Sequence, residues 1–261
     1  LIGVTLIMAG VYRGMIDDAQ ALLDNSGADL WVVQQDTLGP YAEPSSLPDD
    51  AYRSVRLTRG VEQAVNITYL TMQARRGSQD VRTMVVGVAP GASTQPGWPR
   101  HLVAGRHLTH SHYEAVADIA SGFALGDRIQ IRRKQYTVVG LTRRMVSSGG
   151  DPMIFIPLKD AQEAQFLKDN DAIWQSRRRT QANPAFNRPG APGVLDAVIA
   201  SQSSNTSVNA VLVTLQPGHS ADEVAQSIER WKRLTAYTRA DMQEILVGKL
   251  ISTSARQIGM F

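Results

Sequence analysis

The chain has 261 residues, of which 43% are hydrophobic and 20% are charged. This composition excludes a disordered chain, a collagen-like repeat and a polytopic membrane protein within this stretch, and the length suits one large domain or two modest ones. The formal net charge is only +3 and aromatic residues make up 6%, which argues against a nucleic-acid partner. No cysteine is present, so disulfides, thiolate metal sites and cysteine catalysis are excluded.

The first residues form an apolar run, LIGVTLIMAGVY, of roughly 12 residues, shorter than the ~20 that cross a bilayer. Apolar residues then recur at helical spacing as far as Leu23, so we predict one continuous helix. Tyr12 and Arg13 stand where a membrane interface places an aromatic and a basic residue. The glycines of this helix favour the end of a transmembrane helix over its alternative, a buried helix of a soluble protein.

The C-terminal segment gives a second helix. Thr238 followed by Asp241 is a capping signature. Helical spacing then continues through Met242, Ile245 and Leu246. Lys249 and Arg256 suit a helix that approaches a membrane, although any surface helix has such residues.

Between these ends, strand–helix–strand patterns occur twice, on either side of a β-rich insertion. Pro48, with acids after it, opens one predicted helix, and Ser220 with Glu223 forms a capping box for another. We expect an α+β fold with these helices on one face of a sheet. The predicted strands are 28–35, 65–75, 81–88, 128–131, 135–142, 153–158, 208–215 and 234–238, and the predicted interior helices are 48–59, 158–171 and 221–233.

Several segments, in this order, resemble the MacB-like periplasmic core domain of ABC transporter permeases, a group that includes FtsX-like and DevC-like permeases. The matching segments are GADLWVVQQDTLGPYAEPSSLPDDAY (27–52), GVEQAV (60–65), LVAGRHL (102–108), ALGDRIQI (124–131), QYTVVGLT (135–142) and FIPLKDAQEA (155–164). Each is weak alone, and their order across nearly the whole chain carries the resemblance.

The resemblance implies a division of the chain. Residues 25–90 and 207–240 would form a Porter-like subdomain of two βαβ units, split by a β-rich Sabre-like insertion at 91–206. Residues 1–24 would be the end of a first transmembrane helix and its stalk. Residues 241–261 would be a stalk helix that leads to a second transmembrane helix. Tyr12, Arg13, Lys249 and Arg256 would then be membrane-proximal.

The resemblance also implies a function, that of a non-catalytic domain on the periplasmic side of a bacterial inner membrane. It would belong to an export permease that couples ATP hydrolysis by a separate cytoplasmic ATPase to movement in the periplasm. The implied partners are that ATPase, a second permease copy in a dimer, a periplasmic adaptor (membrane fusion) protein and the membrane, with no cofactor in this domain. A lipoprotein-release type of permease is one alternative, and a ligand-binding extracytoplasmic sensor domain is another.

One cluster of titratable residues stands out. His107, His110 and His112 could ligate a divalent metal, but their spacing fits no established metal or catalytic motif. A solvated loop is therefore the favoured interpretation. The chain has no P-loop, and residues 147–150 lack the frame of a nucleophile elbow.

Two loops are predicted to face an adaptor, because loops distant in sequence from both termini are expected to point away from the membrane. One contains Ser148 and Gly149, and the other contains the basic run Arg177, Arg178 and Arg179. Trp31 and Trp231 are predicted to be core packing residues, and His219 a turn residue.

Overall fold

The structure of the chain is a computed structural model that describes residues 2–43, 45–91, 94–165, 178, 182, 207–231 and 233–258. Its described helices, in chain order, are α1 (Ile2–Ser26), α2 (Ala51–Arg56), the 3-10 turn η1 (Ile119–Ser121), α3 (Leu158–Gln165), α6 (Ala221–Glu229) and α7 (Arg239–Ile258). Its described strands are β1 (Leu30–Gln34), β2 (Leu47–Pro48), β3 (Val61–Arg76), β4 (Gln79–Val88), β5 (Leu102–Gly105), β6 (Glu114–Asp118), β7 (Arg128–Ile131), β8 (Lys134–Thr142), β9 (Met153–Pro157), β10 (Ser207–Val208), β11 (Ala210–Leu215) and β12 (Leu234–Thr238).

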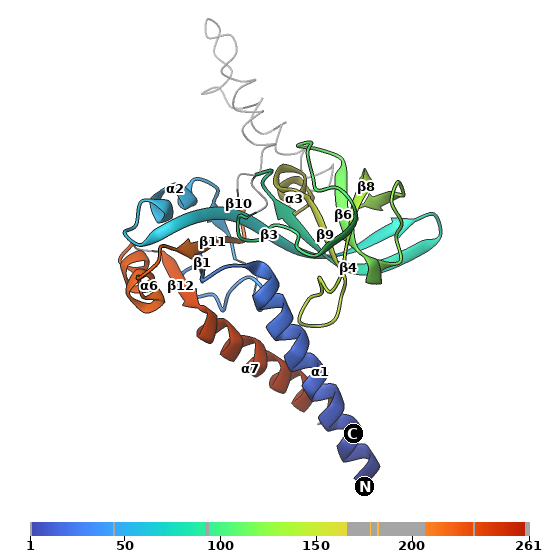
Figure 1. The fold of residues 1–261 in the computed structure, drawn as a ribbon, viewed down its shortest axis with the longest axis horizontal. Helices are drawn as coiled ribbons and strands as arrows, with labels where there is room; N and C mark the ends of the chain where they lie inside the picture. Colours follow the sequence, from blue (N-terminus) through green and yellow to red (C-terminus); the bar gives the residue numbers. More distant parts are fainter. Residues whose placement is uncertain are drawn as a thin grey trace, which may run out of the picture.

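One sheet of ten strands organises the fold (Figure 1). Its order is β12-β1-β11-β3-β4-β9-β6-β8-β5, and β7 pairs with both β3 and β8. The 16-residue strand β3 pairs with β11 along its first half and with β4 along its second half. β4 pairs parallel with β9, so the sheet continues without a break across residue 90, where the sequence predicts a boundary.

The two strand–helix–strand units predicted from the sequence are present and interleaved. β1-α2-β3 is the first unit and β11-α6-β12 is the second. β11 lies between β1 and β3, and β1 lies between β11 and β12, with every neighbouring pair antiparallel. The strands of each unit are therefore hydrogen-bonded to the other unit, and neither unit has a sheet of its own.

Alternation of side chains along β1 separates two cores on the two faces of the sheet. Leu30 and Val32 pack with α2 and α6, while Trp31 and Val33 pack with α1 and α7. The prediction that α2 and α6 share one face is confirmed, and the terminal helices cover the other face. A third core lies among β4, β6, β7, β8 and β9, where Ala161 of α3 packs on the strands. Together, these cores confirm a mixed α and β fold.

Some local predictions are wrong. Pro48 belongs to β2, which pairs with β10, and the helix begins three residues later at Ala51. Ser220 is the N-cap of α6 but makes no side-chain capping hydrogen bond, so the capping box with Glu223 is not formed. Trp231 is 53% exposed, because α6 ends at Glu229 and the residues after it leave the helical repeat. Residues 166–171 of the predicted third helix lie outside the described residues.

Candidate functional site

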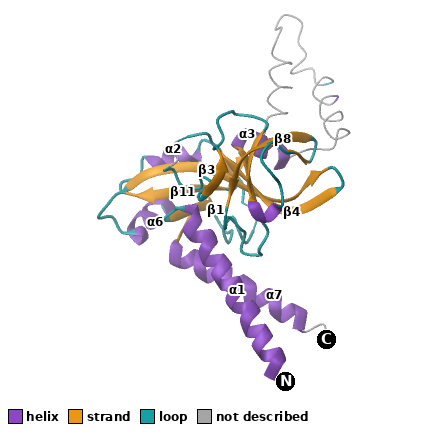
Figure 2. Cartoon of the chain, turned by 45° about the vertical axis from the view of Figure 1, so that its right-hand side comes forward, coloured by secondary structure: helices purple, strands orange, loops and turns teal. Residues whose placement is uncertain are grey.

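The two terminal helices meet the sheet at a single junction. α1 and α7 lie side by side and extend away from the sheet, with the two ends of the chain on the same side (Figures 1 and 2). We call them the stalk helices. Their buried side chains stand at i, i+3 and i+4 spacing, as an amphipathic helix requires. These side chains join the core around Trp31 and are Ala19, Leu22 and Leu23 in α1 and Met242 and Leu246 in α7.

Polar contacts fix the beginning of α7. The Thr238 backbone N–H donates to Asp241 Oδ2 at 2.9 Å, and the Asp241 N–H donates to Thr238 Oγ1 at 3.3 Å. The Thr238 hydroxyl also donates to Asp241 Oδ2 at 2.8 Å. The capping signature predicted at these residues is thereby confirmed. Arg239 forms an ion pair with Asp24 of α1, which joins the two stalk helices at the level of the sheet.

The loop after β1 is held between the sheet and α7. Trp31 Nε1 donates to the Tyr41 hydroxyl at 3.2 Å, and the Tyr41 and Tyr69 hydroxyls lie 3.0 Å apart. Tyr41 is 7% exposed and belongs to the core, and this burial raises its pKa to about 12. From the other side, Lys249 Nζ donates to the carbonyls of Tyr41 and Ala42, at 2.9 and 3.1 Å.

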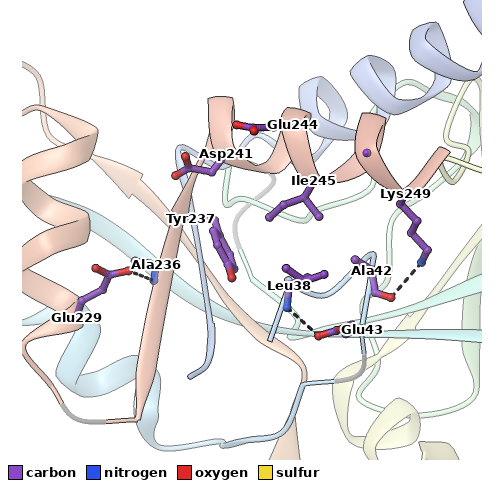
Figure 3. A pocket seen from close by; sticks show the side chains of 11 residues that line it. Leu38, Ala42, Glu43, Glu229, Ala236, Tyr237, Asp241, Glu244, Ile245 and Lys249 are labelled. Atoms are coloured by element: carbon purple, nitrogen blue, oxygen red, sulfur yellow. Dashed lines mark hydrogen bonds between the residues drawn. The ribbon is translucent and has the colours of Figure 1, made fainter. Parts of the chain in front are cut away.

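A groove of about 990 Å³ opens beside this loop, between it, β12 and the exposed side of α7 (Figure 3). Its apolar lining includes Leu38 and Ile245. Four carboxylates line it as well, those of Glu43, Glu229, Asp241 and Glu244.

The outer edge of β12 is closed by acceptors from its own chain. The N–H of Leu234 donates to the Trp231 carbonyl at 3.3 Å. The N–H groups of Ala236 and Thr238 donate to Glu229 Oε1 and Asp241 Oδ2, at 3.2 and 2.9 Å. Such capping blocks the pairing of a further strand with this edge.

α1 is also hydrogen-bonded to the loop that joins β8 to β9. Asn25 Nδ2 donates to the Arg144 carbonyl at 2.9 Å, and Asn25 Oδ1 lies 3.0 Å from His101 Nε2. An added Cβ at Gly150 would stand 3.8 Å from Asp18 Oδ2 of α1. This loop therefore lies against a stalk helix, although it is far from both termini in sequence.

Ser148 and Gly149 are in the β8–β9 loop, which lies against α1. Distance in sequence from both termini therefore does not keep this loop away from the stalk helices, and its contact with an adaptor stays a prediction. The β8–β9 loop is a turn closed by Ser147, whose Oγ accepts the N–H groups of Gly149 and Asp151, at 3.2 and 3.1 Å. Arg177 and Arg179 lie outside the described residues, and Arg178 is exposed.

The residues predicted to be membrane-proximal lie at different positions along the stalk helices. Tyr12 and Arg13 are exposed on α1, before the part of the helix that packs on the sheet. Lys249 is on α7 at the level of the Tyr41 loop, which it holds. Arg256 is in the last turns of α7. No helix among residues 2–165 and 207–258, within their described parts, is long and apolar enough to cross a membrane.

The three histidines do not converge. The His107 ring packs 5.6 Å from the Trp98 ring, between centroids, and burial lowers the pKa of His107. His110 Nδ1 lies 2.6 Å from Glu114 Oε1, and His112 Nδ1 lies 2.7 Å from Asp160 Oδ1. In the described part of the chain, no group of three or more histidines and carboxylates could hold a metal ion.

Asp160 is a buried carboxylate that connects α3 to the residues before β6 and to the start of β8. Its side chain is 0% exposed, and it accepts hydrogen bonds from the Tyr113 N–H at 2.9 Å and Lys134 Nζ at 3.3 Å, besides its contact with His112. Lys134 also pairs with Glu163. Asp160 is 26 positions from Lys134, 47 from Tyr113 and 48 from His112, so no local pattern relates it to these partners.

We predict that the Glu114 carboxylate stabilises the fold and that this stabilisation is lost in acid. Burial alone would raise the pKa of Glu114, but hydrogen bonds from Arg106, His110 and the backbone of Thr109 outweigh burial and hold that pKa well below its ordinary 4.5. Because the folded-state pKa is lower than the unfolded one, the stabilisation is complete above pH 4.5 and is lost as the pH falls below it. Replacing Glu114 by glutamine should cost about 2 kcal/mol at pH 7.

The measurement is urea unfolding of wild type and Glu114→Gln between pH 7 and pH 3. The two free energies of unfolding should approach each other in acid. A difference that is independent of pH would show that the charge of Glu114 does not carry the effect. Asp80→Asn is the matched control, because Asp80 pairs with Arg75 on the surface, where ion pairs contribute little.

Comparison with known proteins shows the family to which this chain is similar. A family model described as the MacB-like periplasmic core domain matches residues 1–231. An uncharacterized ABC transporter permease of Mycobacterium tuberculosis is 24% identical over 218 residues, which cover 82% of this chain and 61% of that protein. Another, of Mycobacterium bovis, is 24% identical over 162 residues, 62% of this chain and 45% of that protein. The chain thus spans less than two thirds of the length of these relatives.

A solved structure has a related fold. The periplasmic region of MacB from Actinobacillus actinomycetemcomitans superposes with a TM-score of 0.52 at 10% identity, over 86% of this chain and 96% of that one. At this identity the likeness concerns the fold alone.

Proposed function

The chain belongs to the family of MacB-like periplasmic core domains, and we propose that it is the extracytoplasmic part of a bacterial ABC export permease that transmits movement of membrane helices to its sheet. The observation that carries this proposal is the stalk. Both ends of the chain leave the same face of the domain through two helices that pack on each other and on the same core. A domain placed between two membrane spans needs this arrangement.

The junction is suited to pass on a displacement. An α-helix rises 1.5 Å per residue, so the 25 residues of α1 span about 37 Å. α7 begins at Arg239 directly after β12 ends at Thr238, so no linker separates α7 from the sheet, and only residues 27–29 separate α1 from β1. The capping box and the Asp24–Arg239 pair oppose a hinge at this point.

The proposed partners follow from the family and from the names of its relatives. A cytoplasmic ATPase would use ATP, a second copy of the permease would complete a dimer, and a periplasmic adaptor protein would take up the movement. The domain would need no cofactor and perform no catalysis. Membership of this family favours a permease, of export or lipoprotein-release type, over a ligand-binding sensor domain.

The test measures movement in the full-length permease with its ATPase in lipid nanodiscs. The chain has no cysteine, so Leu57→Cys gives this segment a single spin-label site. Leu57 follows α2, on the sheet face opposite to the stalk, and is 87% exposed. ATP with vanadate should shift the distance distribution between the labels of two copies.

A variant with a weakened junction between β12 and α7 is compared with a control variant. Thr238→Ala combined with Arg239→Ala should reduce the shift while ATP hydrolysis continues, whereas Arg230→Ala at the exposed C-cap of α6 should leave it unchanged. If the ATPase turns over and the distribution stays the same, the domain does not transmit the movement. If no distance between two labels is detected, the proposed dimer is refuted.

A further inference from the structure

The groove beside α7 has the form of a docking surface. It is lined by the loop that contains Leu38 and Glu43, by β12 and by the exposed side of α7, and its volume is about 990 Å³. Figure 3 shows α7 on one side of it and Leu38 and Glu43 on the other, with Lys249 reaching across to the loop at one end.

The interior of the groove is apolar. Leu38 is 49% exposed although it is a large aliphatic residue. It faces the partly buried Ile245 of α7 and the ring of Tyr237. Gly248 belongs to the same lining, and a Cβ added there would meet no atom within 4 Å. A partner can therefore come close to the α7 backbone at this point.

The rim carries an uncompensated negative charge. Glu43, Glu229, Asp241 and Glu244 face one lysine, Lys249, so these five side chains sum to −3 at neutral pH. Within the described residues, no salt bridge involves any of the four carboxylates. The pKa of Tyr237 is raised by burial and then by the charges of Glu43, Glu229 and Asp241. The groove is thus negative although the whole chain carries +3.

Three of these carboxylates are fixed in position by the backbone. Glu43 accepts the Leu38 N–H at 3.0 Å, and Glu229 and Asp241 accept the outward N–H groups of β12. A rigid acceptor loses less conformational entropy when a cation binds. The same hydrogen bonds leave β12 without outward donors at these positions, so an added β-strand does not fit this groove.

A helix does fit. Asp241, Glu244 and Gly248 stand at i, i+3 and i+7 on α7, so acids and a point of close approach share one helix face. They extend over about 10 Å, or two helical turns. An amphipathic helix docks by laying its apolar face into such a groove, and basic residues at its margins would meet the carboxylates.

We propose that this groove is a docking site for a basic amphipathic helix of a partner protein. Its leucine-sized side chains would contact Leu38, Tyr237 and Ile245, and its lysines or arginines would pair with Glu43 and Glu244. The helix would lie along α7, so its binding would engage one of the two stalk helices directly.

The probe is an amphipathic peptide of leucine and lysine, of about 15 residues, which is long enough to be helical when docked. Its counterpart has glutamate in place of lysine. Binding of each labelled peptide to the 261-residue chain is measured by fluorescence anisotropy. Only the lysine peptide should bind, although the +3 charge of the chain would by itself favour the acidic one.

Two variants locate the binding site. Glu43→Gln with Glu244→Gln removes two charges and keeps an oxygen for the Leu38 N–H, and it should weaken binding about tenfold, as expected for the loss of two ion pairs. Gly248→Leu should block the groove, and it replaces a glycine by a better helix former, which protects folding. Asp222→Asn with Glu223→Gln, two exposed residues in the first turn of α6, removes the same charge elsewhere and should leave binding unchanged.

The outcomes are distinct. Equal binding of both peptides, or an equal loss in the groove and α6 variants, would overturn the proposal. So would concentration-dependent dimerisation of the chain alone that Gly248→Leu abolishes, because the occupant would then be a second copy. Since the assay uses no ATPase, its failure would leave the proposed transmission of movement unaffected.

Discussion

Replacing Trp31 with alanine is expected to destabilise the fold by about 4 kcal/mol, which is the range for deleting a large buried aromatic side chain. Trp31 is completely buried in β1, a strand paired on both sides with β11 and β12. Its side chain packs in the core that joins the stalk helices to the sheet, and its indole N–H donates to Tyr41. A loss of this size consumes much of the stability of an ordinary domain.

Urea unfolding followed by circular dichroism measures this loss. Trp231→Ala is the matched control, because Trp231 is 53% exposed and its removal should change the free energy of unfolding by less than about 0.5 kcal/mol. Tyr41→Phe separates the hydrogen bond from the packing and should cost about 1 kcal/mol. Equal effects of the two tryptophan substitutions would contradict the assignment of the core.

Replacing Asp160 with alanine is expected to cost about 3 kcal/mol. The carboxylate is fully buried and accepts hydrogen bonds from the backbone of Tyr113 and the ammonium of Lys134, and it also contacts His112. Without it, the Tyr113 N–H and the partly buried ammonium of Lys134 lose their common acceptor. Protection from hydrogen exchange should fall in α3 and at the start of β8, where these groups meet.

Glu163→Ala tests whether position or charge matters. Glu163 pairs with the same lysine but is 51% exposed, so its loss should cost less than about 1 kcal/mol. Hydrogen exchange at the distant strand β12 should be unchanged by Asp160→Ala unless the whole chain unfolds. If the two substitutions cost the same, Asp160 does not act as a buried connection.

The features that could be predicted depend on residues that are close together in the sequence. The beginning of α7 depends on Thr238 and Asp241, three positions apart, and the hydrogen bonds between them are present. The buried side of α1 follows from the spacing of Ala19, Leu22 and Leu23. Pro48 shows the limit of such rules, because proline suits the first turn of a helix and also the edge of a short strand.

Contacts between distant residues could not be predicted. Lys249 and the carbonyl of Tyr41 are 208 positions apart, and no local pattern relates them. Ser148 and Gly149 are far from both termini in the sequence, yet the turn after β8 returns to α1. The same holds for the groove, whose lining comes from the β1 loop, α6, β12 and α7.

The pairing of β1 with β12 determines how the domain responds to force. The chain passes from α1 into the sheet at Leu30 and leaves the sheet for α7 at Thr238. These two residues are partners in the antiparallel ladder. If the two stalk helices were pulled apart, the load would fall on this terminal pair and the hydrogen bonds would open one after another, as in a zipper. If both helices moved together along their length, the whole ladder would move as one body. Splaying of the stalk helices would therefore load this ladder, whereas joint movement of both helices would not, and splaying would begin beside the Asp24–Arg239 pair.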